Sequence, residues 1–166
     1  ARPERYQLQS GGFLEEKPEH MIHLRGNILV SKTHPAIRFR GKMDTLQAEL
    51  ILGQQGLPRE KNRLGEILTL SRTLIRCDVM QEPVPMEKLC GLTEQELHRR
   101  SHFPQDYYGK PHFMPEAADG ATVARLNLLR CRVREAELAA AEAFGDSEGN
   151  CRRGDILQAL NRMSSM

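Results

Sequence analysis

The chain has 166 residues, which is enough for one domain with a hydrophobic core and too few for two comfortable ones. Lys and Arg number 24 against 22 Asp and Glu, so the net charge of +2 gives no reason to expect nucleic acid or an anionic membrane as the main partner. No apolar stretch is long enough for a membrane span, and the first ten residues lack the apolar core of a signal peptide. We therefore expect a cytoplasmic protein whose basic sites are local.

The cysteines and the ends of the chain add two expectations. Cys77, Cys90, Cys131 and Cys151 form no CxxC pair, and we interpret them as free thiols. The chain begins with Ala and ends in sequence typical of a helix interior, so we expect a trimmed version of a longer protein.

Two regions are predicted. Residues 1–18 are polar, contain glycine and show no clear period, which predicts a flexible N-terminal arm. Residues 19–166 are predicted to form a helical-bundle domain. Within it, the stretch Glu19 to Lys32 alternates apolar and polar residues and has Gly26 between two apolar runs, which predicts short extended pieces or a hairpin.

The remaining long segments carry apolar residues at helical spacing and stop at glycine or proline. A shorter segment opens with Thr-Glu-Gln-Glu, which has the form of a capping box. Short links favour antiparallel neighbours, so we predict an all-α fold, an up-down five-helix bundle similar to a four-helix bundle. The predicted helices span residues 34–55, 60–80, 93–102 and 121–144, with the last helix starting near residue 153.

One narrow polar stripe runs along the predicted helix 121–144. At 100° per residue, Arg130, Arg134 and Glu137 fall within about 60° of one another, and leucines and Val133 occupy much of the remaining circumference. A helix that is apolar around most of its girth is usually buried, and buried arginines need anionic partners. The partners would be carboxylates or the phosphates of a ligand; from the residues alone, structural salt bridges are the commoner case.

Two further groups have open interpretations. The predicted loop 104–115, with the adjacent Phe103, carries four of the eight aromatic residues. Such a cluster forms a satellite core or the wall of a ligand site. His98 and His102 lie four apart, a spacing that suits zinc, but no third ligand is specified and surface histidines are the commoner interpretation.

Four segments, in the same order, resemble the corrinoid adenosyltransferases that use ATP and cob(I)alamin. Residues 126–138 have two arginines four apart and a glutamate three further on, and residues 160–164 (LNRMS) resemble the family's LNRLS motif. Residues 32–44 resemble its first helix, and residues 112–115 its aromatic-plus-proline loop. The stretches KPEHMIHL and ELHRRSHFPQ are similar in particular to the ethanolamine-utilisation (EutT) branch, which is related to the PduO-type enzymes.

This resemblance implies a ferritin-like, cobalamin adenosyltransferase-like bundle that transfers the 5′-deoxyadenosyl group of ATP to the cobalt of cob(I)alamin. The implied small-molecule substrates are ATP, accompanied by Mg²⁺, and a corrinoid that arrives as cob(I)alamin or cob(II)alamin. The adenosylcobalamin formed would serve ethanolamine ammonia-lyase. The resemblance also implies a homo-oligomer with interfacial sites, a trimer by the family norm with a dimer as the alternative. Association with a metabolic microcompartment is compatible with it.

The nucleotide would be held by residues that match the family's positions. Lys32 and Arg134 would contact the ATP phosphates, where an ammonium or a guanidinium fork makes charge-assisted bonds. Glu137 would support the nucleotide or its magnesium, and Asn161 would face the adenosine. From the residues alone, the alternative for Asn161 is a buried amide that fixes helix register.

The remaining assignments concern the subunit interface and the corrinoid. Asp44 would pair with Arg130 of a neighbouring subunit, or it is a solvated surface acid. Phe113 would be the apolar wedge that displaces the axial ligand of cobalt to leave a four-coordinate Co(II), or it is plain core.

Three departures from the family pattern shape the expectations. The glycine-rich phosphate segment is not visible before Lys32, and Glu135 stands where the family has the second of two adjacent arginines. Many EutT proteins carry a CCxxC motif ahead of the KPEH stretch, where this chain reads QSGGFL (residues 9–14), so we expect no structural zinc or iron there. The rival functions are a non-catalytic, partner-binding helical bundle and a corrinoid-binding, chaperone-like member.

Overall fold

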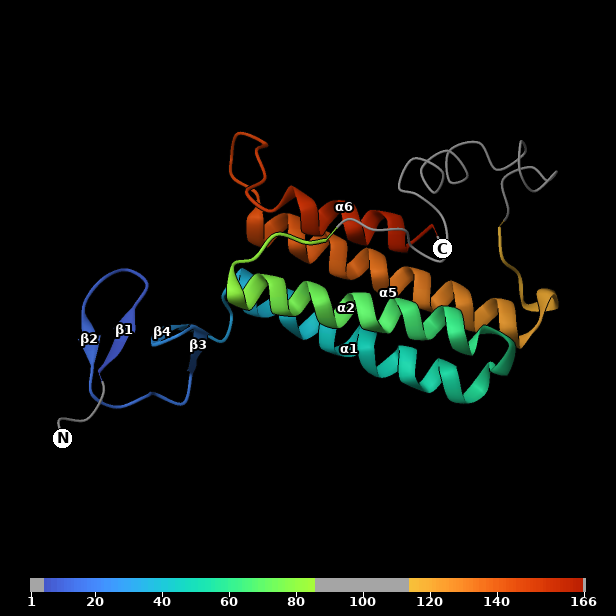
Figure 1. The fold of residues 1–166 in the computed structure, drawn as a ribbon, viewed down its shortest axis with the longest axis horizontal. Coiled ribbons are helices and arrows are strands. Elements are labelled where there is room, and N and C mark those ends of the chain that lie inside the picture. The colour runs from blue at the N-terminus through green and yellow to red at the C-terminus, as the bar shows by residue number, and fades with distance from the viewer. Residues whose placement is uncertain (1–4, 86–113, 166) are drawn as a thin grey trace.

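The computed structural model describes residues 5–85 and 114–165. A small four-stranded sheet lies at one end of a set of long helices, and the helices account for most of the described chain (Figure 1). The strands are β1 (Tyr6–Leu8), β2 (Phe13–Leu14), β3 (Met21–Arg25) and β4 (Ile28–Ser31). The helices are α1 (Pro35–Gly56), α2 (Lys61–Met80), α5 (Ala121–Phe144) and α6 (Gly154–Met163), with 3-10 turns η1 (Pro58–Glu60) and η2 (Ala117–Asp119).

The mostly helical prediction is confirmed, whereas the all-α five-helix bundle is not, because the chain also forms the sheet. The predicted helix 93–102 lies outside the described residues, so the count of five helices stays a prediction. Within the described ranges, no helix combines the length and the apolar character needed to cross a membrane. Cys77, Cys131 and Cys151 are free thiols as predicted, and Cys90 lies outside the described residues.

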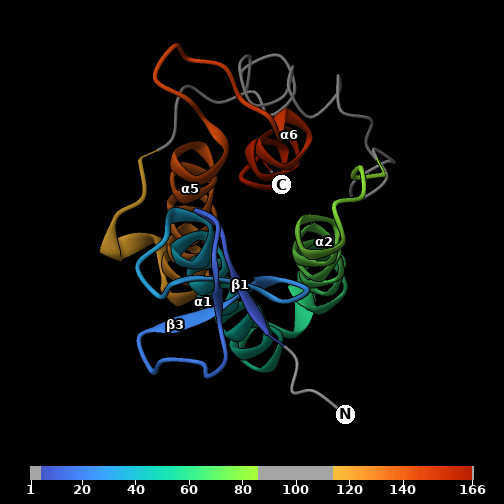
Figure 2. The same cartoon turned by 90° about the vertical axis from the view of Figure 1, so that its left-hand side faces the viewer.

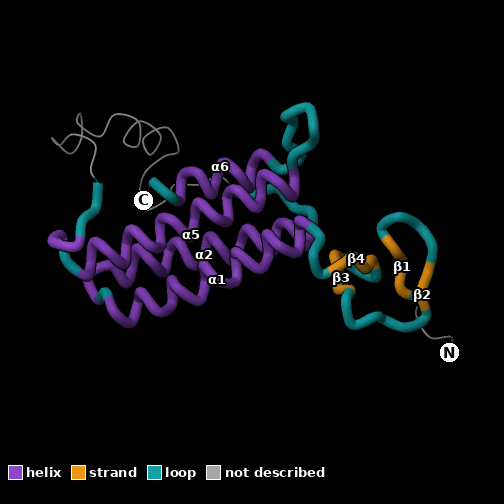
Figure 3. Tube along the Cα trace, turned by 180° about the vertical axis from the view of Figure 1, so that it is seen from behind, coloured by secondary structure: helices purple, strands orange, loops and turns teal. Residues whose placement is uncertain are grey.

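The sheet has the order β2-β1-β4-β3 (Figure 3), and Figure 2 views the molecule from the end where the sheet lies. The predicted hairpin is confirmed, since β3 and β4 pair antiparallel and Gly26, at φ +50°, occupies the turn. β1 pairs in parallel with β4, with Gln7 opposite Ile28, and β2 pairs antiparallel with β1. Two strands therefore lie within residues 1–18, for which no regular structure was predicted; the flexibility of that arm stays a prediction.

The helix ends follow the chemistry of their flanking residues. α1 starts at Pro35, where a missing N–H costs nothing, and His34 caps it by accepting the Ala36 N–H at its Nδ1 (3.0 Å). α2 ends where Gln81 adopts the left-handed conformation, at φ 55°. The predicted boundaries of α1, α2 and α5 and the predicted start of α6 fall within about two residues of the observed ones.

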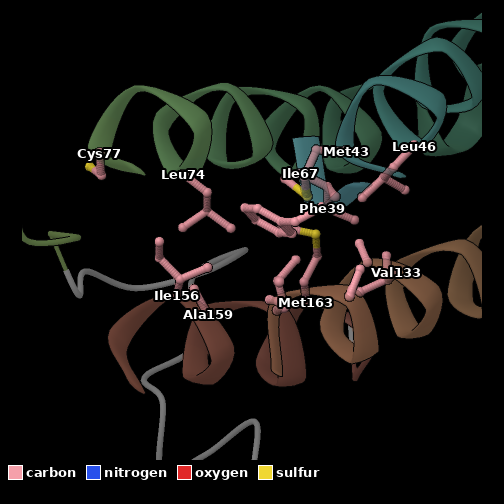
Figure 4. Close-up of a cluster of buried hydrophobic side chains, with 14 of the residues drawn as sticks. Phe39, Met43, Leu46, Ile67, Leu74, Cys77, Val133, Ile156, Ala159 and Met163 are labelled. Carbon is pink, nitrogen blue, oxygen red and sulfur yellow. The ribbon is translucent and has the colours of Figure 1, made fainter. Parts of the chain in front are cut away.

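The core lies between α1, α2, α5 and α6 (Figure 4). Apolar side chains from each helix meet there at helical spacing, and the rings of Phe39 and Phe144 pack edge to face with centroids 5.4 Å apart. Asp78 is a charged residue in this interior, and it pairs with Arg40 at 2.9 Å between α2 and α1. The side chains labelled in Figure 4 are Phe39, Met43, Leu46, Ile67, Leu74, Cys77, Val133, Ile156, Ala159 and Met163.

α1, α2 and α5 approach one another closely at Gly53, which is buried on α1. A Cβ atom at this position would lie 3.1 Å from Cδ1 of Leu64 and 3.4 Å from Cδ1 of Leu129. The absence of a side chain therefore lets leucines from two other helices pack against the backbone of α1.

α1 and α5 run antiparallel, and ion pairs join them along one side of their contact. Each pair has one residue on each helix. α1 supplies the cation in two pairs and the carboxylate in the third. The pairs are Arg38 with Glu142 (3.5 Å), Lys42 with Glu135 (3.4 Å) and Glu49 with Arg132 (2.8 Å).

The prediction that α5 is buried around most of its girth is wrong. Leu128 and Leu138 are 49% and 68% exposed, while the buried side of the helix consists largely of alanines. Small side chains allow the neighbouring helices to approach closely, so a narrow face suffices for packing and the larger leucines remain outside. The buried residues of α5 are Leu129, Val133, Ala136, Ala139, Ala140, Ala143 and Phe144.

Candidate functional site

The predicted polar stripe lies on an open side of α5. Arg130 and Arg134 are exposed and Glu137 is half-buried. Arg130 donates from Nη2 and Nε to Oδ1 of Asn127, at 3.0 and 3.2 Å. Among residues 5–85 and 114–165, neither arginine forms an ion pair with a carboxylate. The salt-bridge interpretation therefore finds no support in the described part of the chain, and both guanidinium groups can receive an anion from outside it.

The end of α6 lies in the same part of the molecule. α5 and α6 run antiparallel after a turn closed by the bridge between Gly145 and Cys151. Asn161 is exposed, so its interpretation as a buried amide is wrong. Its backbone carbonyl accepts the hydroxyl of Ser164 at 2.8 Å, which closes the last turn of the helix.

Arg130 and Ser164 line one groove, with a cavity of about 110 Å³, at the end of the bundle. Its floor includes Leu129, Val133 and Met163, which are buried core residues of α5 and α6. Arg63 and the carboxylate of Glu60 line the groove as well and pair with each other at 3.9 Å, so Arg130 is its cation without a carboxylate partner in the described chain. Such a groove suits a ligand that has an apolar body and an anionic group.

Lys32 lies elsewhere, in the turn between β4 and α1, and its side chain is exposed. Its backbone N–H donates to the carbonyl of His20 at 2.9 Å, which fixes the turn against the start of β3. The neighbouring cleft of about 400 Å³ has polar residues at its rim, among them Ser31 and His34. Lys32 precedes α1 and Arg134 lies within α5, so the two predicted phosphate contacts come from different elements, and their joint role stays a prediction.

Asp44 is exposed on α1 and lines a different groove from Arg130. This groove lies between β3, α1 and α2 and also includes His23, Arg40 and Gln47. Among the described residues Asp44 is an exposed acid without an ion-pair partner, and its pairing with Arg130 of a second copy stays a prediction.

His34 connects the sheet to α1 through both of its ring nitrogens. Nδ1 accepts the Ala36 N–H, so Nε2 carries the proton that is donated to Oε1 of Gln9 at 3.1 Å. Burial, and then the positive charges of Arg152 and Arg40, hold the pKa of His34 below its usual 6.5. The neutral imidazole is therefore the form that joins the two parts of the fold.

Residues 13–166 match the family described as Cobalamin adenosyltransferase. The chain belongs to this family. It is 40% identical over 158 residues to the corrinoid adenosyltransferase EutT of Salmonella typhimurium, and 39% identical over the same length to that of Escherichia coli K12. Each alignment covers 90% of this chain and 57% of the relative, so the chain matches little more than half the length of these curated proteins. No solved structure matches the chain.

The structure gives a role to one departure from the family pattern. Glu135 removes a cation relative to the family's paired arginines, and the structure shows that it accepts from Arg132 at 3.3 Å and from Lys42 at 3.4 Å. The hydrogen bond from Arg132 is the main reason why the pKa of Glu135 lies below its usual value. The spacing of Arg132 and Glu135, three apart on a helix, is visible in the sequence and indicates that they pair. The second partner, Lys42 on α1, is not visible there.

Three of the remaining candidates, Phe113, His98 and His102, lie outside the described residues. In the described ranges, no three His, Cys, Asp or Glu side chains come together in a group that could hold a metal ion. The described part of the candidate site is therefore a set of cationic and amide groups around α5 and α6, with Lys32 and Asp44 on the α1 side.

Proposed function

We propose that the protein transfers the 5′-deoxyadenosyl group of ATP to the cobalt of cob(I)alamin and so forms adenosylcobalamin, for use by ethanolamine ammonia-lyase. The observation that carries this proposal is the open side of α5, where Arg130 and Arg134 have no carboxylate partner in the described chain. In a member of the cobalamin adenosyltransferase family, the guanidinium of Arg134 suits a phosphate of ATP, and that of Arg130 suits a carboxylate of a second copy.

Adenosyl transfer requires that the protein position the two substrates and stabilise the charge that develops on the leaving group. Co(I) is already a strong nucleophile, so no general base is needed. Its electron pair forms the Co–C bond to C5′ of the ribose while the C5′–O bond breaks, and the polyphosphate leaves with the electrons of that bond. The protein holds cobalt in line with C5′ and stabilises the charge on the leaving group. Arg134 and Lys32 carry the second task.

Mg²⁺ would accompany ATP, because this ion commonly uses one or two protein carboxylates together with substrate phosphates. Glu137 fits that requirement as a half-buried carboxylate three residues beyond Arg134 on α5. Asn161, exposed near the end of α6, would offer its amide to the adenosine.

The complete site would form between two copies of the chain. Asp44 lines a groove beside α1, and Lys32 adjoins the cleft at the start of that helix. Arg130 lines a different groove, together with Ser164. An ion pair between Asp44 of one subunit and Arg130 of the next would bring the two half-sites together. We propose a trimer, with a dimer as the alternative that the same pairing allows.

Phe113 would provide the apolar wedge that excludes water from cobalt and favours four-coordinate Co(II). Phe113→Ala is expected to lose activity mainly when the substrate is Co(II)alamin with a reductant, and less with preformed Co(I)alamin. Initial rates of adenosylcobalamin formation from the two substrates measure this. Equal losses with both would remove the wedge assignment.

One assay tests the function as a whole. The protein is mixed with ATP and chemically reduced cobalamin, and the absorbance change to adenosylcobalamin is followed. Product formation that saturates with ATP is the expected result. If no product forms at any ATP concentration while reduced cobalamin still binds, the corrinoid-chaperone alternative replaces the enzyme; if cobalamin does not bind either, a partner-binding bundle does.

A further inference from the structure

A polar junction lies immediately before α6. The guanidinium of Arg153 forms a fork with the carboxylate of Asp155, with Nε to Oδ1 at 3.1 Å and Nη2 to Oδ2 at 3.2 Å. The same guanidinium donates to the backbone carbonyls of Cys77 at 3.2 Å and Glu82 at 2.7 Å. Arg153 therefore binds the end of α2 and the start of α6 at the same time.

Asp155 completes the junction from the other side. Its Oδ2 accepts the backbone N–H of Val84 at 2.9 Å, and its Oδ1 accepts that of Ile156 at 3.0 Å. Burial raises the pKa of the Asp155 carboxyl, but the hydrogen bonds from Arg153 and Val84 outweigh it and hold the pKa below 3.8. The charged carboxylate thus ties α6 to the segment that follows α2.

Each charge sits at the helix end that favours it. The guanidinium lies at the C-terminal end of α2, where the helix dipole is negative, and it shares the Cys77 carbonyl with the Glu82 N–H. The carboxylate lies in the first turn of α6, where free N–H groups make the dipole positive. The fork itself is mostly buried, since the side chains of Arg153 and Asp155 are 14% and 28% exposed.

α6 depends on such fixing because it has only ten residues. A helix of that length is not stable by itself, and apolar packing alone does not define its direction, since the hydrophobic effect is non-directional. Asn161 follows Asp155 by six residues, or about 9 Å along the helix axis. A tilt of α6 at the junction would therefore displace the amide that is proposed to face the nucleotide.

We propose that Arg153 and Asp155 are positioning residues for adenosyl transfer, which fix α6 on α2 so that Asn161 meets the adenosine of ATP. Neither residue touches a substrate in this assignment. The inference rests on the proposed function, because Asn161 has its role only there.

The test compares Asp155→Asn with Asp78→Asn. Asp78 forms a similarly buried ion pair with Arg40, which joins α1 to α2; its charge acts on Arg153, but no hydrogen bond links it to the fork of Arg153 with Asp155. For Asp155→Asn we expect the KM for ATP to rise between about five- and fiftyfold, with kcat changed less than about threefold. Asp78→Asn should lower the melting temperature at least as much and leave the KM within about twofold. Arg153→Lys, which keeps the charge without the fork, should fall between wild type and Asp155→Asn.

Amide hydrogen exchange in residues 157–163 gives a readout that needs neither ATP nor cobalamin. Faster exchange confined to α6 in Asp155→Asn, and absent in Asp78→Asn, supports the junction. Unchanged exchange in α6, or a KM that follows the loss of melting temperature equally in both variants, overturns the inference. If the wild-type protein forms no adenosylcobalamin, the proposed function fails, and the exchange experiment still decides whether the junction fixes α6.

Discussion

Two charged sides of α5 contrast sharply although they share one helix. On the side toward α1, Arg132 and Glu135 pair with each other and with charges on α1. On the neighbouring side, Arg130 and Arg134 meet no carboxylate in the described residues. The same residue types therefore have different roles according to what lies opposite them. The paired side holds the fold together, and the open side is available to a ligand or a second subunit.

The paired side also specifies how α5 aligns with α1. Surface ion pairs add little to stability, but they distinguish one alignment from another. A shift of α5 by four residues would replace every charged partner with an apolar or thiol side chain. Leu138 would then face Arg38, Cys131 would face Lys42, and Leu128 would face Glu49.

The largest expected effect separates the two sides directly. Arg134→Ala should lower kcat/KM for ATP by about a hundredfold or more, because one donor to the leaving polyphosphate is lost. Arg132→Ala, two residues away, should lower the melting temperature and leave kcat/KM within about threefold. Steady-state kinetics with thermal unfolding measures both. Similar activity losses in the two variants would contradict the division of α5 into a structural and a functional side.

The next effect concerns the partner expected for Arg130. Arg130→Asp and Asp44→Arg should each lower activity at least about tenfold and weaken the oligomer, because like charges would face each other between subunits. The double variant restores opposite charges and should recover most of both properties. Analytical ultracentrifugation and the cobalamin assay measure the outcome. A double variant as impaired as the singles would show that these residues do not pair.

The smallest effect contrasts the charged pairs of α5 with the neutral connection at His34. Because its folded-state pKa lies below 6.5, the unfolded chain takes up the proton first, so stability is lost as the pH falls from 6.5 through the folded-state pKa. The melting temperature should therefore decrease between about pH 7.5 and about pH 5.5. The lowered pKa values of Glu135, Asp146 and Asp155 take effect near and below their usual values of 4.5 and 3.8, at lower pH than this range.

His34→Asn is the matched variant for this titration. Asn retains a side-chain cap for α1 but does not titrate in that range. Its melting temperature should be lower overall and less dependent on pH. A pH dependence equal to that of the wild type would assign the effect to another group.

The long helices were predictable because their apolar spacing and their stops are local. Pro35 and Gly56 mark the ends of α1 in the sequence as they do in the structure. The strands of residues 6–14 were not predictable, because β1 has three residues, β2 has two, and β1 pairs with a strand about twenty residues away. Strands this short show no alternation of apolar and polar residues that could identify them, and they form only by pairing with the rest of the sheet.

The site was predictable only in part. The spacing of Arg130 and Arg134 placed them correctly on one side of α5, but the sequence did not show whether that side is buried. It is open because alanines such as Ala136 and Ala140 satisfy the packing on the other side. The junction of Arg153 with Asp155 escaped prediction because its main partners are backbone groups about seventy residues away.

Gly53 connects the close packing of the helices with the width of a binding groove. The two leucines that rest on its backbone, Leu64 and Leu129, also line the groove shared by Arg130 and Ser164. Any added side chain would push these leucines toward the groove and narrow the space beside the arginine. The size of a single buried residue, which touches no proposed substrate, thus sets the range of ligand shapes that this end of the bundle admits.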